Sequence, residues 1–282
     1  MHFTFNIRRK FVQIVMSCIT NWELTNLFAG KIYKGPGKNL CTPGLNCYSC
    51  PAATLSCPIG ALQTVGGNSG FGISLYVSGF LLLLGVLMGR FVCGFLCPFG
   101  FFQELLHKLP VTKKKLFHPL IYVKYAVLAV FVLLVPLWGA VSGSQCLPAF
   151  CQYICPAGTL EGAVPMLLTH PEIRQAVGIL FGWKILVLLG VVVGCTFIYR
   201  FFCKALCPLG AIYGLLNPVS MYRLRLAKQR CIDCGICQNV CPMNINPARQ
   251  TASAECIMCG KCIEACPHQA LYLGREIKER CC

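Results

Sequence analysis

The chain has 282 residues, of which 56% are hydrophobic and only 12% are charged. Soluble globular domains carry about 25% charged residues, so this composition, with a mean hydropathy of +0.65, excludes an ordinary soluble protein and favours a membrane protein. The formal net charge of +16 does not indicate a nucleic-acid partner, because the basic residues flank apolar segments and the count takes all 23 cysteines as neutral.

Four apolar segments predict transmembrane helices, at residues 11–29, 71–88, 119–138 and 176–199. The first is the weakest, since Asn21, Glu23 and Asn26 interrupt it. Lys184 in the fourth would cost about 3 kcal/mol at mid-bilayer, so we expect its amine to reach toward the nearer surface. A cleaved signal peptide is the alternative for the first segment, but no Ala-x-Ala site follows it.

Lysine and arginine are concentrated on the face that holds residues 1–10, 89–118 and 200–282. The positive-inside rule makes this face cytoplasmic, so the sequence predicts a multi-pass protein of a prokaryotic cytoplasmic membrane with both termini in the cytoplasm. The basic segment 223–230 is expected to be either an interfacial linker that anionic membrane lipid attracts or a solvated tether.

One cysteine motif occurs twice, each time directly after an apolar segment on the cytoplasmic face. Arg90-Phe-Val-Cys93-Gly-Phe-Leu-Cys97-Pro-Phe-Gly100 recurs as Arg200-Phe-Phe-Cys203-Lys-Ala-Leu-Cys207-Pro-Leu-Gly210. The membrane part is therefore predicted to be a duplicated helix-pair unit. Cysteines four residues apart share one helix face, so Cys93, Cys97, Cys203 and Cys207 are expected to bind one metal cluster. The alternative is that they are structural thiols.

The Cys-Pro-x-Gly part of this motif also begins at Cys57 and Cys155, on the opposite side of the membrane. We expect Cys151 and Cys155 to join Cys57 and then Cys50 at an outer cluster, by analogy with the inner site. The cysteines on that side that remain, Cys41, Cys47 and Cys146, would form a disulfide, serve a second cluster with a non-cysteine ligand, or have no such role. A purely disulfide role for the outer cysteines is the alternative.

Near the C-terminus, two runs have the spacing Cys-x2-Cys-x2-Cys-x3-Cys-Pro, which is typical of bacterial ferredoxins with two [4Fe-4S] clusters. In this pattern the fourth cysteine of each run binds the cluster of the other run. The predicted ligand sets are Cys231, Cys234, Cys237 and Cys266 for one cluster, and Cys241, Cys256, Cys259 and Cys262 for the other. Zinc knuckles are the alternative, but structural zinc has no use for the third cysteine and the Cys-Pro of each run. We divide the chain into a membrane domain, 1–222, and a cytoplasmic ferredoxin domain, 223–282.

Together these patterns predict an α-helical membrane protein with four transmembrane helices and a C-terminal 2[4Fe-4S] ferredoxin domain, with the third cluster at the inner membrane face. The five histidines lie outside the cores of the apolar segments, so a haem relay is not expected. The sequence shows no nucleotide or covalent flavin site, which favours passing electrons on over converting a substrate.

The duplicated Cys-x3-Cys-Pro motifs, followed by CIDCGICQNVCPMNINP and CIMCGKCIEACPHQAL, resemble the NapH/NosR-type membrane ferredoxins over about residues 5–275. The resemblance implies an electron-transfer subunit that takes electrons from quinol or a cytoplasmic protein and serves an extracytoplasmic reductase. Its partners would be other redox proteins and membrane lipid, with a quinone as a further candidate cofactor. The cysteine-rich loop LCTPGLNCYSCPAATLSCPIGALQ exceeds the simplest NapH-like pattern, which puts a nitrate-reductase role in doubt.

The function expected from the sequence is a relay of single electrons between a cytoplasmic or quinone donor and an acceptor at or beyond the membrane. It would act as part of an oxidoreductase system, for which quinol dehydrogenation is one candidate reaction. The rival hypotheses are a redox or iron sensor, whose clusters control an interaction, and a cysteine-based metal carrier.

Overall fold

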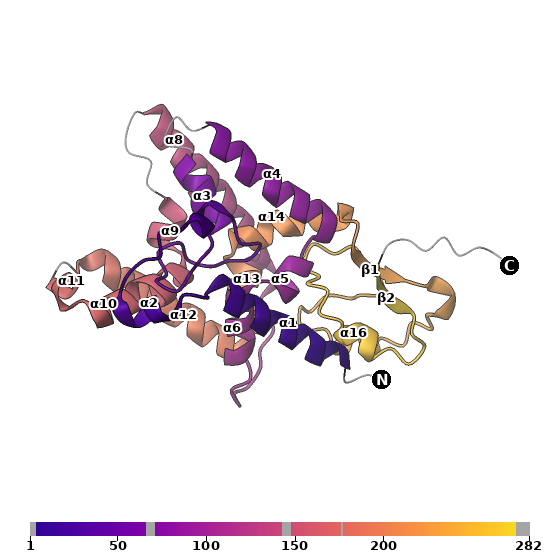
Figure 1. Ribbon diagram of the computed structural model, residues 1–282. Helices are drawn as coiled ribbons and strands as arrows, with labels where there is room; N and C mark the ends of the chain where they lie inside the picture. The colour runs from indigo at the N-terminus through magenta and orange to yellow at the C-terminus, as the bar shows by residue number, and fades with distance from the viewer. Residues whose placement is uncertain (1–3, 66–70, 143–147, 176, 275–282) are drawn as a thin grey trace.

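The computed structural model describes residues 4–65, 71–142, 148–175 and 177–274. Within these ranges the chain is mostly helical and has one two-stranded sheet, which lies in the C-terminal module. The long helices extend away from this module, which is yellow and orange in Figure 1.

The N-terminal region contains α1 (Thr4–Thr20), α2 (Leu24–Ala29), the 3-10 turn η1 (Pro36–Asn39) and α3 (Pro58–Val65). The prediction of one continuous helix over 11–29 is wrong, because α1 begins earlier and ends at Thr20. Two side chains end it: the Thr20 hydroxyl donates to the carbonyl of Met16 at 2.8 Å, and the Asn21 amide donates to that of Ser17 at 3.1 Å. Such bonds compete with the helical backbone ladder.

Helix α1 has its polar side toward the protein and its apolar side outward. Arg9 and Gln13 are buried, and the Gln13 side chain donates to the carbonyl of Gly94 at 2.9 Å. Phe11, in contrast, is 66% exposed. This polarity is the reverse of that of a helix on the surface of a soluble protein.

Three long helical segments follow. The first is α4 (Phe71–Met88) and the last is α12 (Ile179–Phe197). The middle one is a composite helix, which consists of η2 (His118–Tyr122), α7 (Val123–Val127), the π-helical η3 (Leu128–Leu134) and α8 (Val135–Val141). By length and composition, His118–Gly139 and Ile179–Phe197 can cross a membrane, and Leu75–Met88 is a shorter apolar helix. The π-helical stretch ends just before Pro136, which lacks a backbone N–H and so disturbs the regular ladder.

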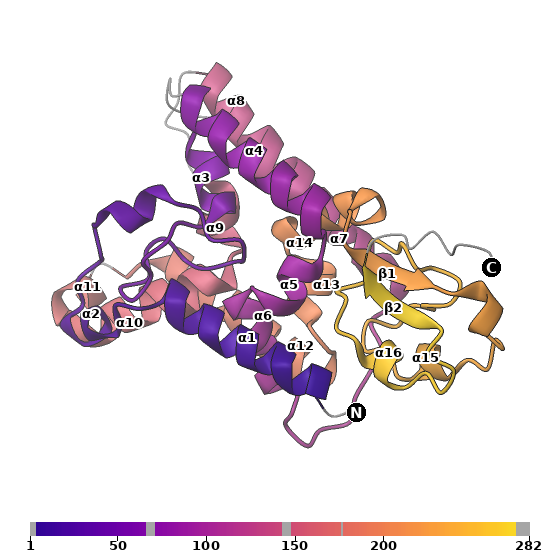
Figure 2. The ribbon, with the colours of Figure 1, turned by 45° about the vertical axis from the view of Figure 1, so that its right-hand side comes forward.

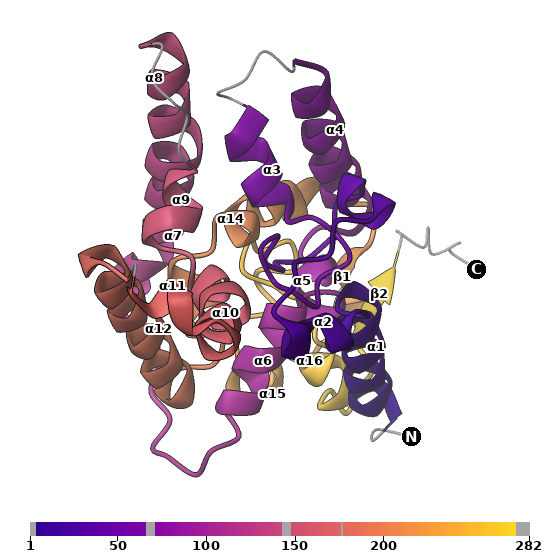
Figure 3. The same ribbon diagram turned by 60° about the vertical axis from the view of Figure 1, so that its left-hand side comes forward.

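Each copy of the repeated motif folds as a pair of short helices directly after a long helix. The pairs are α5 (Phe91–Phe95) with α6 (Pro98–Leu106), after α4, and α13 (Phe201–Ala205) with α14 (Pro208–Leu216), after α12. Cys97 and Cys207 are the N-cap residues of α6 and α14, and the proline that follows each suits the first helical position. Between the two copies lie α9 (Ala149–Tyr153), the π-helical η4 (Gly158–Ala163), α10 (Val164–Thr169) and α11 (Pro171–Gln175). Figure 3 shows α9 to α12 together at one side of the molecule.

The C-terminal module begins after η5 (Asn217–Val219). It contains β1 (Arg223–Leu226), η6 (Lys228–Arg230), α15 (Ile236–Asn239), α16 (Lys261–Glu264) and β2 (Leu271–Gly274). The two strands pair antiparallel, with Arg223 opposite Gly274 and Leu226 opposite Leu271. The prediction of a linker or tether at 223–230 is therefore wrong, since its first half is a strand of the module (Figure 2).

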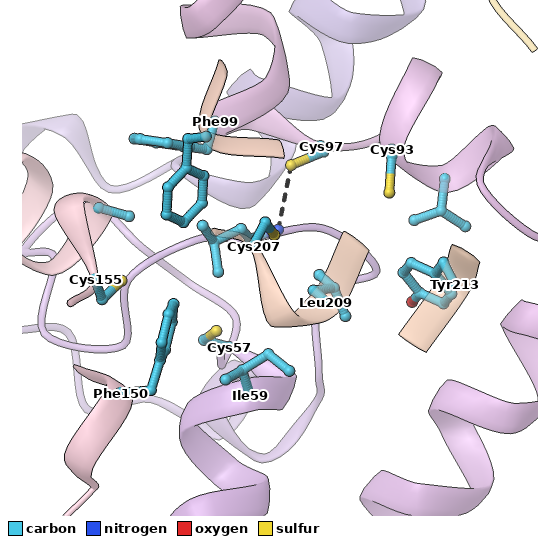
Figure 4. Packing of buried hydrophobic residues seen from close by; sticks show 14 of the residues in the cluster. Cys57, Ile59, Cys93, Cys97, Phe99, Phe150, Cys155, Cys207, Leu209 and Tyr213 are labelled. Atoms are coloured by element: carbon cyan, nitrogen blue, oxygen red, sulfur yellow. Dashed lines mark hydrogen bonds between the residues drawn. The ribbon is translucent and has the colours of Figure 1, made fainter. Parts of the chain in front are cut away.

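One packed core joins the membrane part to the C-terminal module. It includes Val92 and Phe99 from the first motif, Phe202 and Leu209 from the second, and Ile257 from the module. Cysteines of the motifs lie in this same core (Figure 4). The module is thus held against the helices by packing.

Candidate metal centres

The two ferredoxin-type runs surround two separate cavities in the C-terminal module. One cavity is lined by Cys231, Cys234, Cys237 and Cys266, and the other by Cys241, Cys256, Cys259 and Cys262. Each set takes three cysteines from one run and the fourth from the other, which is the crossed arrangement expected from the spacing.

The backbone of the two runs adopts the same unusual turns. Asp233 and Gly235 have φ values of 53° and 73°, and Met258 and Gly260 at the equivalent positions have 54° and 80°. Left-handed residues within such a short loop turn successive backbone N–H groups toward one concave side, which suits an anionic group. The module is therefore an internal two-fold repeat with one cavity for each run.

The repeated membrane motifs bring Cys93, Cys97, Cys203 and Cys207 together, and we call these four the inner group. All four are buried. Cys97 Sγ accepts from the amide of Gly100 at 3.4 Å, and Cys207 Sγ accepts from the amide of Gly210 at 3.3 Å. Burial, and then the thiols of Cys203 and Cys93, raise the pKa of Cys97 to about 12. Four such thiols ionise together only around a cationic centre, so this donor set fits a bound metal cluster.

Two buried arginines, one from each motif, cross over to the other motif. Arg200 donates to the carbonyl of Cys93, and Arg90 donates to the carbonyl of Cys203 at 3.3 Å. The exchange is reciprocal, so each arginine fixes the first cysteine of the opposite copy.

Each arginine also pairs with a carboxylate that holds a second cation. Glu104 binds Arg200 at 2.6 Å and Arg9 at 2.7 Å, whereas Glu255 of the C-terminal module binds Arg90 at 2.7 Å and also pairs with Lys124. These ion pairs were not predicted from the sequence. The one feature of the sequence that pointed to them is the arginine that stands three residues before the first cysteine of each motif.

The outer cysteines form a group that differs by one residue from the predicted one. Cys57, Cys151 and Cys155 line a cavity of about 470 Å³, and the fourth cysteine there is Cys47. We call these four the outer group. Cys50 does not line this cavity but packs beside it with Ala52, Ala53 and Cys47, and its Sγ lies 4.0 Å from Oδ1 of Asn21.

The remaining cysteines on this side are placed differently. Cys41 is buried, and its backbone forms an isolated bridge with Ser56. Cys146 lies outside the described residues. Among those that are described, no three Cys, His, Asp or Glu side chains are grouped tightly enough to hold a single metal ion.

The residue six positions after each Cys-Pro cysteine makes a long-range hydrogen bond, and for Gln103, Gln63 and Glu161 the partner is a cysteine in the other half of the same site. Gln103 donates to Cys203 Sγ at 3.0 Å and accepts from the amide of Cys203, and Gln63 donates to Cys151 Sγ at 3.5 Å. Glu161 accepts from the amide of Cys47 at 2.8 Å, and the Tyr213 hydroxyl donates to the carbonyl of Pro43 at 3.0 Å. These residues were not predicted from the sequence, although all four follow a Cys-Pro cysteine at the same spacing.

The segment 43–47 connects the inner group to the outer group. The amide of Leu45 donates to Cys97 Sγ at 3.3 Å, and Leu45 and Asn46 line the cavity of the outer group together with Cys57. Gly44 lies so close to the backbone of Cys97 that a Cβ on it would be 2.6 Å from the Cys97 Cα. This loop segment thus contacts a sulfur of the inner group and also lines the cavity of the outer group.

The residues that follow Cys93 and Cys203 of the inner group contact the C-terminal module. A Cβ at Gly94 would lie 2.3 Å from the carbonyl oxygen of Ile257, and Lys204 donates to the carbonyl of Pro242 at 2.9 Å. Ile257 follows Cys256, and Pro242 follows Cys241, so both contacts are next to the second cavity of the module.

Comparison with known proteins identifies iron-sulfur domains in this chain. The model of a 4Fe-4S binding domain matches residues 69–116, 125–164 and 180–226, and the model of a 4Fe-4S dicluster domain matches residues 223–267. The chain is 29% identical over 172 residues to the putative electron transport protein YccM of Escherichia coli, which is 58% of this chain and 44% of that protein. It is 26% identical over 150 residues to the ferredoxin-type protein NapH of Haemophilus influenzae, which is 39% of this chain and 51% of that protein. The chain belongs to the NapH-type polyferredoxin family.

An uncharacterized protein of Methanocaldococcus jannaschii is 29% identical over 175 residues, which is 58% of this chain and 56% of that protein. The chain thus spans only about half the length of these relatives. No solved structure matches it significantly. Within this NapH-type chain, the matched segments include Cys151, Cys155 and the whole inner group, but not Cys47 and Cys57. Half of the outer group therefore lies in the loop that exceeds the simplest NapH-like pattern.

Proposed function

We propose that this chain relays single electrons at a membrane through four [4Fe-4S] clusters, each of which supplies one-electron redox chemistry when bound. The proposed ligand sets are the two in the C-terminal module, the inner group, and the outer group of Cys47, Cys57, Cys151 and Cys155. The protein residues hold these clusters in sequence and exclude water from the inner ones. The donor would be a cytoplasmic protein or quinol, and the acceptor would lie at or beyond the membrane.

The observation that carries this proposal is that each cysteine group adjoins the next through residues packed between them. Gly94 and Lys204 contact the backbone beside the second module cavity, and Leu45 donates to Cys97 Sγ and lines, with Asn46, the cavity of the outer group. A bilayer core is about 30 Å thick, so a relay across it needs stations inside. The loop segment 43–47 reaches the inner group and so supports such a path.

The distribution of polarity supports a membrane location. Arg9, Arg90, Arg200 and Lys124 are almost fully buried, while Leu83, Leu134 and Leu186 on the three long helices are 59%, 58% and 62% exposed. A protein with its charged groups buried and its apolar groups on the surface is suited to an environment of lipid. We propose that α1, α4, the composite helix 118–141 and α12 cross the membrane, with both chain termini in the cytoplasm.

The test is a count of iron and acid-labile sulfide in anaerobically purified protein, with EPR spectra of the reduced form. We expect about 16 iron ions per chain in the wild type and about 12 in Cys203→Ser. Cys195→Ser is the matched control, since Cys195 is buried near Gln103 but belongs to none of the four groups, and it should keep about 16. About eight in the wild type would restrict the function to the C-terminal module.

Proteoliposomes separate a relay from a sensor. With a reductant on one side and an acceptor on the other, the wild type should sustain electron transfer and Cys203→Ser should not. A normal rate in Cys203→Ser would remove the inner group from the path. A wild type with all its clusters and no sustained transfer would favour a redox or iron sensor.

A further inference from the structure

A strongly basic cavity lies where the helices meet the C-terminal module. It has a volume of about 380 Å³, and eight lysine and arginine side chains line it. The contributing residues include Lys10 of α1, Lys261 of α16, and Lys108, Lys113, Lys114 and Lys115 of the loop after α6. Such a concentration of positive charge around one cavity attracts an anion.

The protein does not neutralise this charge from within. Glu104 is the one carboxylate among the described lining residues, and it already pairs with Arg9 and Arg200. Lys113 donates to the carbonyls of His107, Leu109 and Thr196, so it serves to fix the loop on the end of α12. Within the described residues, no ion pair links a carboxylate to Lys108, Lys114 or Lys115, and all three are exposed.

The position and surroundings of the cavity favour a lipid headgroup. The amide of Lys114 donates to the carbonyl of Phe197 at 2.9 Å, so the basic loop is attached where α12, an apolar helix long enough to span a membrane, ends. Leu105, Leu109 and Val111, in and beside the same loop, are 52%, 48% and 37% exposed. Basic residues next to exposed apolar ones at this level match a phosphate with acyl chains beside it, and basic pockets of this kind bind anionic headgroups.

We propose that this cavity binds the phosphate of an anionic phospholipid, with Lys108, Lys114 and Lys115 as its main cationic contacts and Leu105, Leu109 and Val111 against the acyl chains. The bound headgroup lies beside Lys204, Pro242 and Lys261, next to the second cavity of the C-terminal module. Lipid composition would then act directly on the contact between that module and the helices. This proposal does not depend on the relay, because it requires only the folded chain.

The test uses the full-length protein in nanodiscs and in detergent. Native mass spectrometry titrations with phosphatidylglycerol should show specific binding that Lys108→Gln/Lys114→Gln/Lys115→Gln weakens about 100-fold, which corresponds to about 2.8 kcal/mol. The control is Lys31→Gln/Lys34→Gln/Lys228→Gln, which removes the same number of lysines from outside the cavity and should bind like the wild type. Unchanged iron content in both variants shows that they fold. Should the triple variant not fold, Lys114→Gln alone should bind about fivefold more weakly.

Three results would overturn the proposal. Equal binding of phosphatidylcholine and phosphatidylglycerol would show that the cavity does not select anionic lipid. An equal loss in the control variant would show that only the total charge matters. Inorganic phosphate that displaces phosphatidylglycerol completely at low millimolar concentration would identify a soluble phosphate compound as the ligand. None of these results bears on the iron count, so the relay and the lipid site fail separately.

Discussion

Glu104 is the residue whose loss should most clearly reveal how the two motifs are held together. It is only 9% exposed, and it accepts hydrogen bonds from Arg9, Arg200 and the Tyr199 hydroxyl, at 2.7, 2.6 and 2.7 Å. Burial alone would raise the pKa of Glu104, but the charges of Arg200 and Arg9 outweigh it and lower the pKa to about 2. The substitution Glu104→Gln keeps the shape of the side chain and removes its charge.

The magnitude follows from this pKa. A decrease from 4.5 to about 2 corresponds to a stabilisation of about 3 kcal/mol when the group is ionised. Removing one partner of a buried ion pair costs a similar amount, because the other charge is left uncompensated. Since the folded-state pKa is depressed, the contribution is complete above about pH 4.5 and is lost only as the pH falls through about 2. We therefore expect Glu104→Gln to lower the free energy of unfolding by about 3 kcal/mol throughout the neutral range.

The assay is denaturant unfolding of the protein in detergent micelles, followed by tryptophan fluorescence at pH 6, 7 and 8. The control is Glu172→Gln in α11, an exposed carboxylate that should change the free energy by less than about 0.5 kcal/mol. A loss of less than about 1 kcal/mol in Glu104→Gln would refute the idea that this carboxylate holds the two arginines in place. A loss that varies between pH 6 and 8 would refute the assignment of the effect to Glu104 itself, because its pKa lies below this range.

Two further predictions concern the ligands of the outer group and the contact between the inner group and the C-terminal module. Cys47→Ser should lose about four iron ions per chain, whereas Cys50→Ser should keep them all, and the reverse result would restore the ligand set expected from the sequence. Gly94→Ala would place a Cβ 2.3 Å from the carbonyl of Ile257 and so force the C-terminal module away. Stopped-flow reduction should then show slower electron transfer from the module to the inner group at an unchanged iron content. Gly79→Ala, whose Cβ would meet nothing within 4 Å, should have the wild-type rate.

The sequence was sufficient to place the cysteines of the C-terminal module because their geometry is local. Three cysteines within seven residues, separated by left-handed turns, can face only one small cavity, and the Cys-Pro that follows directs the fourth cysteine to the other one. The grouping of the inner cysteines could also be expected, because a repeated frame at the ends of two long helices on one face favours a meeting of the copies, and their binding of a cluster stays a prediction. The family resemblance rests on these same short-range patterns.

The outer group could not be predicted fully because its fourth cysteine belongs to an irregular loop. Cys47 and Cys50 are both near Cys57 in the chain, and only contacts distant in sequence distinguish them. The amide of Cys47 donates to Glu161, whereas Cys50 turns toward Asn21. Neither contact follows from the cysteine spacing.

The first helix was misplaced for a different reason. A hydropathy argument gives weight to apolar residues, but α1 begins at Thr4 and includes Arg8, Arg9 and Lys10 in its first two turns. Arg9 is tolerated there because Glu104 neutralises it inside the protein. A buried ion pair between segments 95 residues apart leaves no periodic signal in the sequence.

One position where the two motif copies differ is also where the duplicated unit meets a single partner. The arginine, both cysteines, the proline and the glycine are the same in each copy, and the two arginines make the same contact with the opposite copy. The residue after the first cysteine is glycine in one copy and lysine in the other, and both contact the C-terminal module. Only one module packs against this pair, so it cannot present the same surface to both copies. Gly94 leaves room for a carbonyl that approaches closely, and Lys204 extends to a carbonyl farther away. The two copies therefore had to differ at this position for the module to dock beside the inner group.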